Sequence, residues 1–252
     1  MESKSPSKLP LSCLLKLKRW NTPTIYNGWE QITKRPRTTG FNLEETRDFM
    51  PEFGSMVGYA VTVKIKPSEP GSNPNAWEEY RHYLASVPGP TIIVMQDLDK
   101  PNVYGSFWGE VSANTHKTLG CVGVIVDGAI RDLDEMKSAG FKALARRLCV
   151  GHAYAAPISW GEPVDVFGTR VNTGDLIHAD KHGFLIIPQE DQEQILEAAL
   201  FMDNNECNTV IDAAMTHKNS QNQEAIAEKM NDAAKAFGKA AFDKFNKEGE
   251  WK

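Results

Sequence analysis

Four apolar runs alternate with helix-like segments in the first part of the chain, and this order constrains the fold more than any other feature. The runs are residues 56–65, 91–95, 121–126 and 141–150. A continuous apolar run is typical of a strand covered on both faces, and a helix between two such strands is typical of a parallel sheet. Short strands with glycine turns follow, at 164–168, 171–175 and 184–187. We therefore expect an α/β fold with a mixed sheet.

Both ends of the chain carry helical patterns. Leucines at 11, 14, 15 and 17 indicate a short amphipathic helix after the polar residues 1–9. Residues 189–202 are typical of a helix, and apolar side chains recur every three or four residues from Ile226 to Phe245. That last stripe needs a partner surface, either in the same domain or in another subunit. The expected domains are an N-terminal segment and helix (1–20), a catalytic domain (21–206) and a C-terminal helical extension (207–252).

Composition narrows the class of protein. The net charge of −5 gives no sign of a general nucleic-acid or membrane surface. The four cysteines form no Cys-x-x-Cys pair, which disfavours a zinc site or a disulfide framework. No run approaches the roughly 20 apolar residues of a membrane-spanning helix, and the N-terminus lacks a cleavage pattern. We expect a cytoplasmic protein with reduced thiols and with no nucleic-acid or membrane partner.

Two acids and an arginine follow adjacent predicted strands. Glu110 opens a helix-like segment, and Arg131 and Asp132 follow the run 121–126 after an expected turn at Asp127–Gly128. One βαβ unit would bring these residues together at the ends of neighbouring strands, where open α/β sheets bind ligands. Chemistry is expected at this edge.

Each of these residues also has a purely structural interpretation. Asp132 with Glu135 three residues later resembles a capping box, although a capping carboxylate keeps a second oxygen for a cation such as Mg²⁺. Arg131 suits two-point recognition of a carboxylate, or a surface salt bridge to Asp134 or Glu135. Glu110 marks a helix N-terminus that could bind an anion, or it only complements the helix dipole.

The combined spacing resembles the RraA-like proteins. The family pattern is an acid, then twenty residues, then Arg-Asp, and a further acid three positions after the Asp. In this chain the pattern corresponds to Glu110, Arg131, Asp132 and Glu135. The resemblance extends from about Thr22 to Pro188. That family includes class II 4-hydroxy-4-methyl-2-oxoglutarate aldolases, 4-carboxy-4-hydroxy-2-oxoadipate aldolases and oxaloacetate decarboxylases. It implies a swivelling-type α/β domain in a homotrimer or homohexamer, with the active site between subunits. Further familial segments are 58–63, 127–128, 174–180 and 182–183.

The resemblance also implies roles for single residues. Asp132 would be the protein ligand of Mg²⁺ or Mn²⁺, Arg131 would contact the keto or carboxylate oxygens of the substrate, and Glu110 would hold a metal-bound water. The turn formed by Gly109, Glu110, Val111 and Ser112 would present backbone N–H groups to the substrate carboxylate. The implied activity is a divalent-metal-dependent carbon–carbon lyase that releases pyruvate from short 2-oxo acids.

The chain departs from the aldolases in several places. Gly151–Ala156 lacks the lysine that they use after the corresponding strand, which leaves decarboxylation the less demanding reaction and makes His152 a candidate substrate contact. Asn27–Gly28 replaces a more usual Asp-Ala. An acid from a neighbouring subunit is also expected, with Glu197 and Glu206 as unanchored candidates. His178 and His182 are better interpreted as turn or structural residues than as a metal site.

Some RraA-like proteins regulate a ribonuclease by binding to it, which gives an alternative from another functional class. Such regulators are not expected to need the complete acid, Arg-Asp and acid set, so its presence here favours an enzyme. The lysines at 235, 239, 244 and 247 keep a partner-binding role open for the C-terminal helix, and their structural interpretation is a solvated helix face.

Overall fold

The computed structural model describes residues 8–217, 222–247 and 249, so most of the polar segment expected at 1–9 lies outside the described residues. The chain divides into two compact units, Met1–Thr22 with Thr38–Gln189 and Pro23–Arg37 with Glu190–Lys252. Each is described by itself. The expected domain division at residues 20 and 206 stays a prediction. Within the described residues, no helix combines the length and the apolar character needed to cross a membrane.

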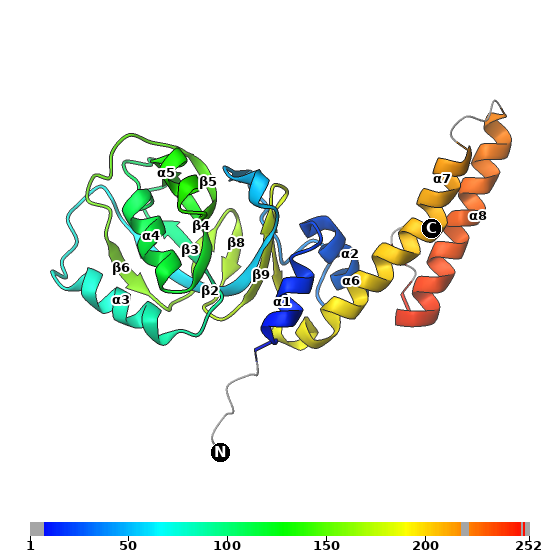
Figure 1. Cartoon of the computed structure of the whole chain (residues 1–252), viewed down its shortest axis with the longest axis horizontal. Helices are drawn as coiled ribbons and strands as arrows, with labels where there is room; N and C mark the ends of the chain where they lie inside the picture. The colour runs from blue at the N-terminus through cyan, green and yellow to red at the C-terminus, as the bar shows by residue number, and fades with distance from the viewer. Residues whose placement is uncertain (1–7, 218–221, 248, 250–252) are drawn as a thin grey trace, which may run out of the picture. The chain divides into compact units, whose positions relative to one another are not determined.

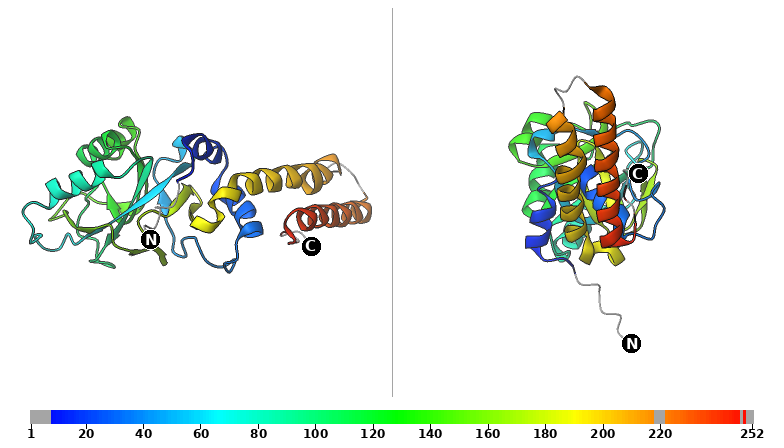
Figure 2. Two further views of the ribbon diagram at one scale, coloured as in Figure 1. Left: turned by 90° about the horizontal axis from the view of Figure 1, so that it is seen from below. Right: turned by 90° about the vertical axis from the view of Figure 1, so that its right-hand side faces the viewer.

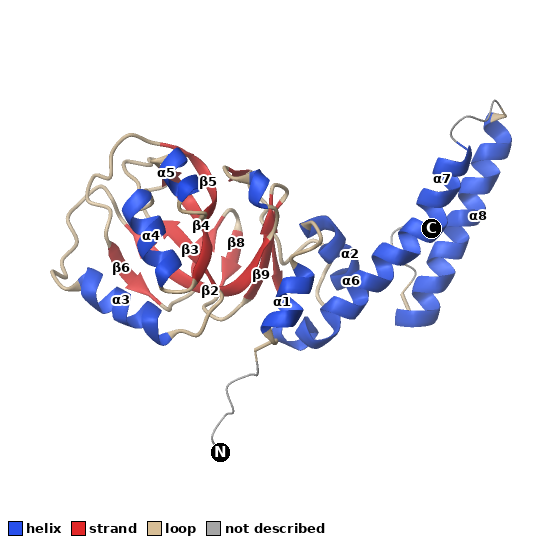
Figure 3. Ribbon diagram, viewed as in Figure 1, coloured by secondary structure: helices blue, strands red, loops and turns tan. Residues whose placement is uncertain are grey.

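The first unit is built on an eight-stranded mixed sheet with the order β1-β5-β4-β3-β2-β9-β10, and β6 pairs with β2 as well (Figures 1 and 3). Strands β2 to β5 are parallel, whereas β1, β6, β9 and β10 join antiparallel. The expected α/β fold with a mixed sheet is confirmed. The strands are β1 (Arg47–Asp48), β2 (Met56–Ile65), β3 (Thr91–Asp97), β4 (Cys121–Ile130), β5 (Lys142–Leu148), β6 (Pro157–Trp160), β9 (Leu176–Asp180) and β10 (Gly183–Ile187), with a separate hairpin of β7 (Val164–Val166) and β8 (Thr169–Val171).

Three helices connect the parallel strands in sequence: α3 (Ala76–Ser86), α4 (Glu110–Thr118) and α5 (Leu133–Ser138). Because each connection moves one strand along the sheet in the same direction, right-handed crossovers place all three helices on one face (Figure 1). The leucine pattern correctly predicts the short helix α1 (Leu11–Leu17), which packs near β2. A 3₁₀ turn, η1, covers Pro51–Phe53.

Both faces of the central strands are buried. Along β3, Ile93 and Met95 face the helices, while Ile92 and Val94 face a second cluster that includes Phe167. This two-sided burial is the physical reason that the strands appear in the sequence as uninterrupted apolar runs.

The second unit is helical. It contains α2 (Thr22–Ile32), η2 (Gln189–Asp191), α6 (Gln192–Glu206), the π-helical stretch η3 (Cys207–Ile211), α7 (Asp212–His217) and α8 (Gln223–Phe245). Figure 2 shows α8 lying beside the α6–α7 run. The apolar stripe of α8 finds its partner within this unit, because Phe237 and Ala241 pack with Met202 and Val210.

The residues Thr22-Pro23-Thr24 predict an interruption of the chain, but helix α2 begins there. Proline is compatible with the first turn of a helix, where its missing N–H has no partner to lose, so Pro23 does not interrupt the helix. Gly28 explains one departure from the aldolases: a Cβ there would lie 2.8 Å from the backbone carbonyl carbon of Ala198 in α6. Close helix packing therefore requires glycine at this position.

Two expected details of the sheet are wrong. Asp127–Gly128 is not a turn, because β4 continues through both residues to Ile130 with a register shift between Val126 and Ala129. The expected strand at 171–175 is instead the end of β8 and a turn. In that turn the Asp175 carboxylate accepts the N–H of Asn172 at 2.7 Å.

Two buried histidines make the stability of the fold depend on pH. Burial lowers the pKa of His178 and of His116 to about 4. His178 lies 3.2 Å through Nε2 from the Leu17 carbonyl oxygen and 2.9 Å through Nδ1 from the Thr22 hydroxyl, an arrangement that suits the neutral ring. Between about pH 6.5 and pH 4 these two histidines bind protons in the unfolded chain but stay neutral in the folded chain.

We therefore expect the free energy of unfolding, measured with urea, to be greatest above about pH 6.5 and to fall as the pH decreases toward 4. The loss per pH unit should be smaller in His178→Gln. The matched control is His82→Gln, at an exposed histidine, which should retain the wild-type slope. A free energy of unfolding that stays constant between pH 7.5 and pH 5 would contradict this expectation.

Candidate active site

The segment before α4 is tied to the carboxyl end of β4. Trp108 forms an isolated parallel bridge with Ile130, and the N–H of Arg131 donates to the Trp108 carbonyl oxygen at 3.1 Å. The buried Ser106 hydroxyl lies 2.8 Å from the Ala129 carbonyl oxygen and accepts the Trp108 N–H at 3.0 Å. These bonds place the first turn of α4 beside the residues that follow β4.

Asp132 directs its carboxylate toward that first turn and not onto its own helix. Its backbone is left-handed, with φ 51° and ψ 50°, and its side chain makes no capping hydrogen bond to α5. Oδ2 instead accepts the backbone N–H of Glu110 at 3.2 Å. The capping-box interpretation is therefore wrong. Aspartate tolerates the left-handed conformation better than most residues, which makes this turn accessible.

Gly109 makes the approach of the carboxylate possible. A Cβ at this position would overlap Asp132 Oδ2 and would lie 3.2 Å from Cγ. The glycine backbone is extended, so the requirement comes from this contact and not from backbone strain. The site thus contains a cradle for one carboxylate that a side chain would fill.

Arg131 lies beside the same carboxylate. Its Nε is 3.6 Å from Asp132 Oδ2, and its Nη1 donates to the Val150 carbonyl oxygen at 3.4 Å. Both charged side chains are about one-third exposed. In the described structure Arg131 makes no ion pair with Asp134 or Glu135, the two alternatives that the sequence left open. A cation and an anion therefore face solvent together.

The first turn of α4 offers backbone donors. Glu110 is exposed at its start, and the Ser112 hydroxyl donates to the Phe107 carbonyl oxygen at 2.7 Å. Among the described residues, the N–H groups of Val111 and Ser112 have no hydrogen-bond acceptor. Free N–H groups at a helix start, together with the helix dipole, form a site for an anion. Glu135 is exposed on the first turn of α5.

The donor set fits a hard divalent cation held by a single carboxylate. No group of three histidine, cysteine or acidic side chains that could hold a metal occurs among residues 8–217 and 222–247. Asp132 Oδ1 accepts no hydrogen bond from the described part of the chain, so it is open to a cation. Mg²⁺ commonly takes one or two protein carboxylates and keeps water and substrate oxygens as its other ligands, whereas structural zinc needs four ligands.

Other candidate residues lie elsewhere. His178 is buried under α1, and the Nδ1–H of His182 donates to the Asp180 carboxylate at 3.0 Å, so both have structural contacts as expected. His152 is exposed in the loop after Val150, with Nδ1 bonded to the Ala153 carbonyl oxygen, and its substrate role stays a prediction. Glu197 and Glu206 lie on α6, where Glu197 pairs with Lys244 at 2.5 Å, and a role for either acid also stays a prediction.

An ion cluster at the same sheet edge was missed in the sequence. Asp127 is fully buried on β4, and its carboxylate pairs with Lys100 and Arg146 and accepts the N–H of Phe167 at 2.9 Å. Burial raises the pKa of neighbouring Asp97 to about 6, and the charges of Asp99 and Asp127 add to the rise. An aspartate inside an apolar run was the signal for this cluster, and the turn assignment concealed it.

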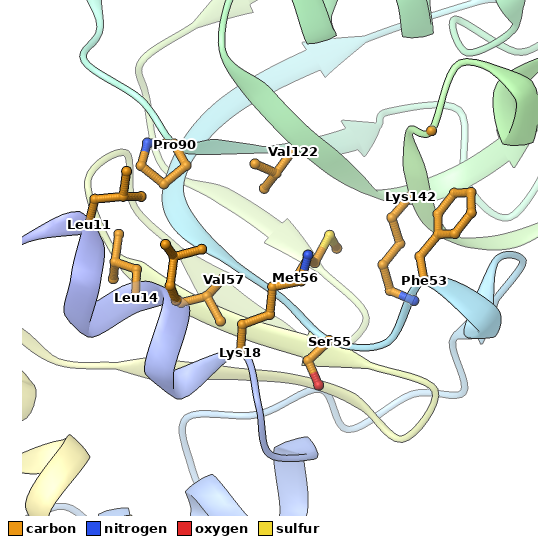
Figure 4. A pocket seen from close by; sticks show the side chains of 12 residues that line it. Leu11, Leu14, Lys18, Phe53, Ser55, Met56, Val57, Pro90, Val122 and Lys142 are labelled. Atoms are coloured by element: carbon orange, nitrogen blue, oxygen red, sulfur yellow. The ribbon is translucent and has the colours of Figure 1, made fainter.

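The opposite edge of the sheet has a cavity of different character. It has a volume of about 380 Å³ and lies between α1 and the starts of β2 and β4 (Figure 4). Its walls are mainly apolar, with Leu11, Leu14, Met56 and Val122 among them. The buried Lys142 ammonium beside it is bound to Asp48 at 2.5 Å. Reactive groups therefore gather at the carboxyl edge and not here.

The Gly109 cradle can be tested directly. We expect Gly109→Ala to turn the Asp132 carboxylate away, because Oδ2 is the mobile end of a short side chain. Hydrogen exchange of the Glu110 amide should then accelerate about two- to tenfold, the equivalent of one ordinary hydrogen bond. Gly71→Ala is the control, since a Cβ there meets nothing within 4 Å. An unchanged Glu110 exchange rate in Gly109→Ala would contradict the cradle.

The chain resembles proteins with several different names. A protein of Halalkalibacterium halodurans named "Putative 4-hydroxy-4-methyl-2-oxoglutarate aldolase" is 30% identical over 159 residues, which cover 63% of this chain and 71% of that protein. Protein DlpA of Legionella pneumophila is 24% identical over 147 residues, which cover 58% of this chain and only 23% of DlpA. The chain therefore spans less than a quarter of DlpA.

Two solved structures share the fold. One is an uncharacterized protein from Pseudomonas syringae, with a TM-score of 0.68 and 18% identity over 90% of this chain and 97% of that one. The other is a Streptomyces coelicolor protein described as an unusual member of the RNase ES inhibitor RraA protein family, with a TM-score of 0.63 and 20% identity over 80% of this chain and 96% of that one. The family model described as RraA-like, Aldolase/RraA, matches residues 22–186. Since that match covers more than half of the chain, the protein belongs to the RraA-like family.

Proposed function

We propose that this protein is a divalent-metal-dependent lyase that cleaves a carbon–carbon bond in 2-oxo acids and releases pyruvate. The observation that supports the proposal most directly is the Asp132 carboxylate, held by the Glu110 N–H in the Gly109 cradle, with the Arg131 guanidinium beside it. An RraA-like relative named as an aldolase agrees with this class of reaction.

Substrate binding follows from the donors at this edge. The free N–H groups of Val111 and Ser112 suit the 1-carboxylate of a 2-oxo acid, because the start of α4 favours an anion. Arg131 has its Nη1 fixed by the Val150 carbonyl oxygen, so the guanidinium is oriented before substrate arrives. It is placed to bind the keto oxygen or the carboxylate through a charged hydrogen bond.

A divalent cation would be held by Asp132, with Mg²⁺ or Mn²⁺ as the expected ion. When bound, it would supply Lewis-acid stabilisation of negative charge on the substrate oxygens. Arg131 would contribute in the same direction, because its permanent positive charge lies beside Asp132 and would stabilise the charge that the keto oxygen gains.

Two reactions share this requirement. In both, the bond between C3 and C4 breaks and its electron pair stays on the pyruvate fragment, which then gains a proton at C3. From oxaloacetate, carbon dioxide leaves. From a 4-hydroxy-2-oxo acid, the hydroxyl loses its proton and C4 leaves as a carbonyl compound. We propose that Glu110, an exposed carboxylate at the start of α4, holds the water that accepts that proton.

We also propose that the protein assembles as a homotrimer or a doubled trimer with the site at a subunit interface. Two exposed valines adjoin the site, because the Val150 carbonyl oxygen accepts from Arg131 and Val111 follows Glu110; Val150 is 95% exposed and Val111 79%. Tyr104 and Tyr154, in the loops before α4 and after β5, are 58% exposed each. Such a patch is typical of a protein–protein contact. The acid expected from a neighbouring subunit would arrive across the same surface.

The oligomer proposal predicts a mass change. We expect sedimentation equilibrium to give a multiple of three chains for the native protein, and Val150→Asp to shift it toward monomer because a charge would be desolvated at the contact. Leu43→Asp, at an exposed leucine on another part of the first unit, is the control. A monomeric native protein would refute this arrangement.

The catalytic proposal predicts a specific loss. Asp132→Asn should lower pyruvate release from oxaloacetate or from 4-hydroxy-4-methyl-2-oxoglutarate by about a hundredfold or more, and Arg131→Ala should lower it by a similar factor. Release should need added Mg²⁺ or Mn²⁺ and should stop with chelator. Asp134→Asn, an exposed acid on the same turn, serves as the control. The lyase proposal fails if Asp132→Asn keeps wild-type turnover and metal dependence.

The alternative is a non-catalytic regulator that binds a ribonuclease or another protein, as the description of the Streptomyces coelicolor relative suggests. The ordered arrangement of Asp132, Arg131 and the free N–H groups argues for the enzyme, since a binding surface has no need of a carboxylate cradle. The regulator would be favoured if the protein turns over no 2-oxo acid but binds a ribonuclease and inhibits it.

A further inference from the structure

A groove between α3 and α4 adjoins the candidate active site. It has a volume of about 440 Å³, within the range of about 300–1,000 Å³ that is usual for small-molecule pockets. Trp77 and Arg81 line it from the first two turns of α3, and Val111 and Thr115 line it from the first two turns of α4. Both helices begin at the carboxyl edge of the parallel sheet, so the groove opens at the edge where Asp132 lies.

The groove is continuous with the proposed substrate-binding turn. Val111 and Ser112 line its wall, and the same two residues carry the free N–H groups at the start of α4. A molecule whose carboxylate binds those groups can therefore extend its far end between the helices.

Apart from Arg81, the described residues that line the groove are uncharged, and three of them carry rings: Trp77, Tyr80 and His116. Trp77 is 36% exposed and stacks on Phe107 with ring centroids 4.7 Å apart, which fixes the orientation of the indole. On the floor, His116 Nε2 lies 3.0 Å from the Tyr80 hydroxyl, and its Nδ1 lies 2.6 Å from the Ser112 carbonyl oxygen. Burial lowers the pKa of His116 to about 4, so this pair is neutral near pH 7. An apolar group fits such a floor.

Arg81 is the one charged residue among those described in the groove lining. It is exposed, and its guanidinium makes no ion pair or hydrogen bond with the described part of the chain. Arginine recognises carboxylates through paired N–H donors. An unpaired arginine at the far end of an aromatic groove therefore suits a ligand that is apolar in the middle and anionic at its end.

We propose that this groove binds the part of the substrate beyond C4, and that the substrate is a 4-hydroxy-2-oxo acid with an apolar group of aromatic size and a terminal carboxylate bound by Arg81. This inference rests on the proposed lyase function. It assigns Trp77 and Arg81 as specificity-determining residues. Neither residue belongs to the Glu110, Arg131 and Asp132 pattern or to the Gly109 cradle.

Two matched substrates separate the contributions of the groove: 4-hydroxy-2-oxo-4-phenylbutanoate and the same compound with a carboxylate at the para position of the ring. We expect Arg81→Gln to lower kcat/KM about tenfold or more for the para-carboxy compound, and by less than about threefold for the phenyl compound. Thr115→Phe, which fills the groove, should lower kcat/KM for both. Arg19→Gln removes the same charge from an exposed arginine after α1 and is the control.

The result that overturns the inference is an equal effect of Arg81→Gln on the two compounds, or no effect, while oxaloacetate is still converted to pyruvate. That outcome leaves the lyase proposal intact. If no 2-oxo acid is cleaved, the lyase proposal fails, and a binding measurement then tests whether the groove holds such a ligand. The probe is then 4-(4-carboxyphenyl)-2-oxobutanoate, which lacks the hydroxyl, titrated calorimetrically into the native chain and Arg81→Gln. Weaker binding to the variant supports the groove, and equal or absent binding rejects it.

Discussion

The short tie between Trp108 and the end of β4 is the constraint on which the site depends. Trp108 is completely buried, its indole stacks on Phe141 with centroids 5.3 Å apart, and its backbone pairs with Ile130 and accepts the N–H of Arg131. The core therefore holds the loop before α4 against the strand that delivers Arg131 and Asp132. A carboxylate and a helix N-terminus meet with little freedom to move, because both are anchored to the same packed layer.

The sequence predicted the parallel core well. Each central strand is buried on both faces and is therefore a continuous apolar run, and helical segments separate these runs. It failed where a polar residue sits inside such a run. Asp127 resembles a turn residue locally, yet its charge is compensated by Lys100 and Arg146, two side chains brought from distant segments. No local pattern carries that compensation. Pro23 gave the opposite error, because it predicted an interruption where a helix begins. Proline breaks a helix at interior positions but is compatible with the first turn.

For the site, spacing predicted which residues meet but not how they meet. Twenty residues of helix and strand separate Glu110 from Arg131 and Asp132, so proximity follows from the topology alone. The direction of the Asp132 carboxylate does not follow from the topology. The same residues, Asp132 and Glu135, are compatible with a capping box and with a left-handed turn whose carboxylate points away from α5. Gly109 was noticed only as the start of a turn, whereas its missing Cβ is what admits the carboxylate. Tertiary contact decided each of these points.

The groove changes how the two candidate reactions compare. The lysine that the aldolases use is absent, and that alone made decarboxylation of oxaloacetate the simpler assignment. A four-carbon substrate such as oxaloacetate, however, has nothing beyond C4. It therefore has no group to occupy a 440 Å³ groove that shares Val111 and Ser112 with the proposed substrate-binding turn. Arg81 lies in that groove without an ionic partner among the described residues. In the proposed substrate complex Arg81 would be a second cation beyond C4 and would take the place of the lysine from another helix. On that proposal the missing lysine indicates a different substrate chain and does not count against aldol cleavage.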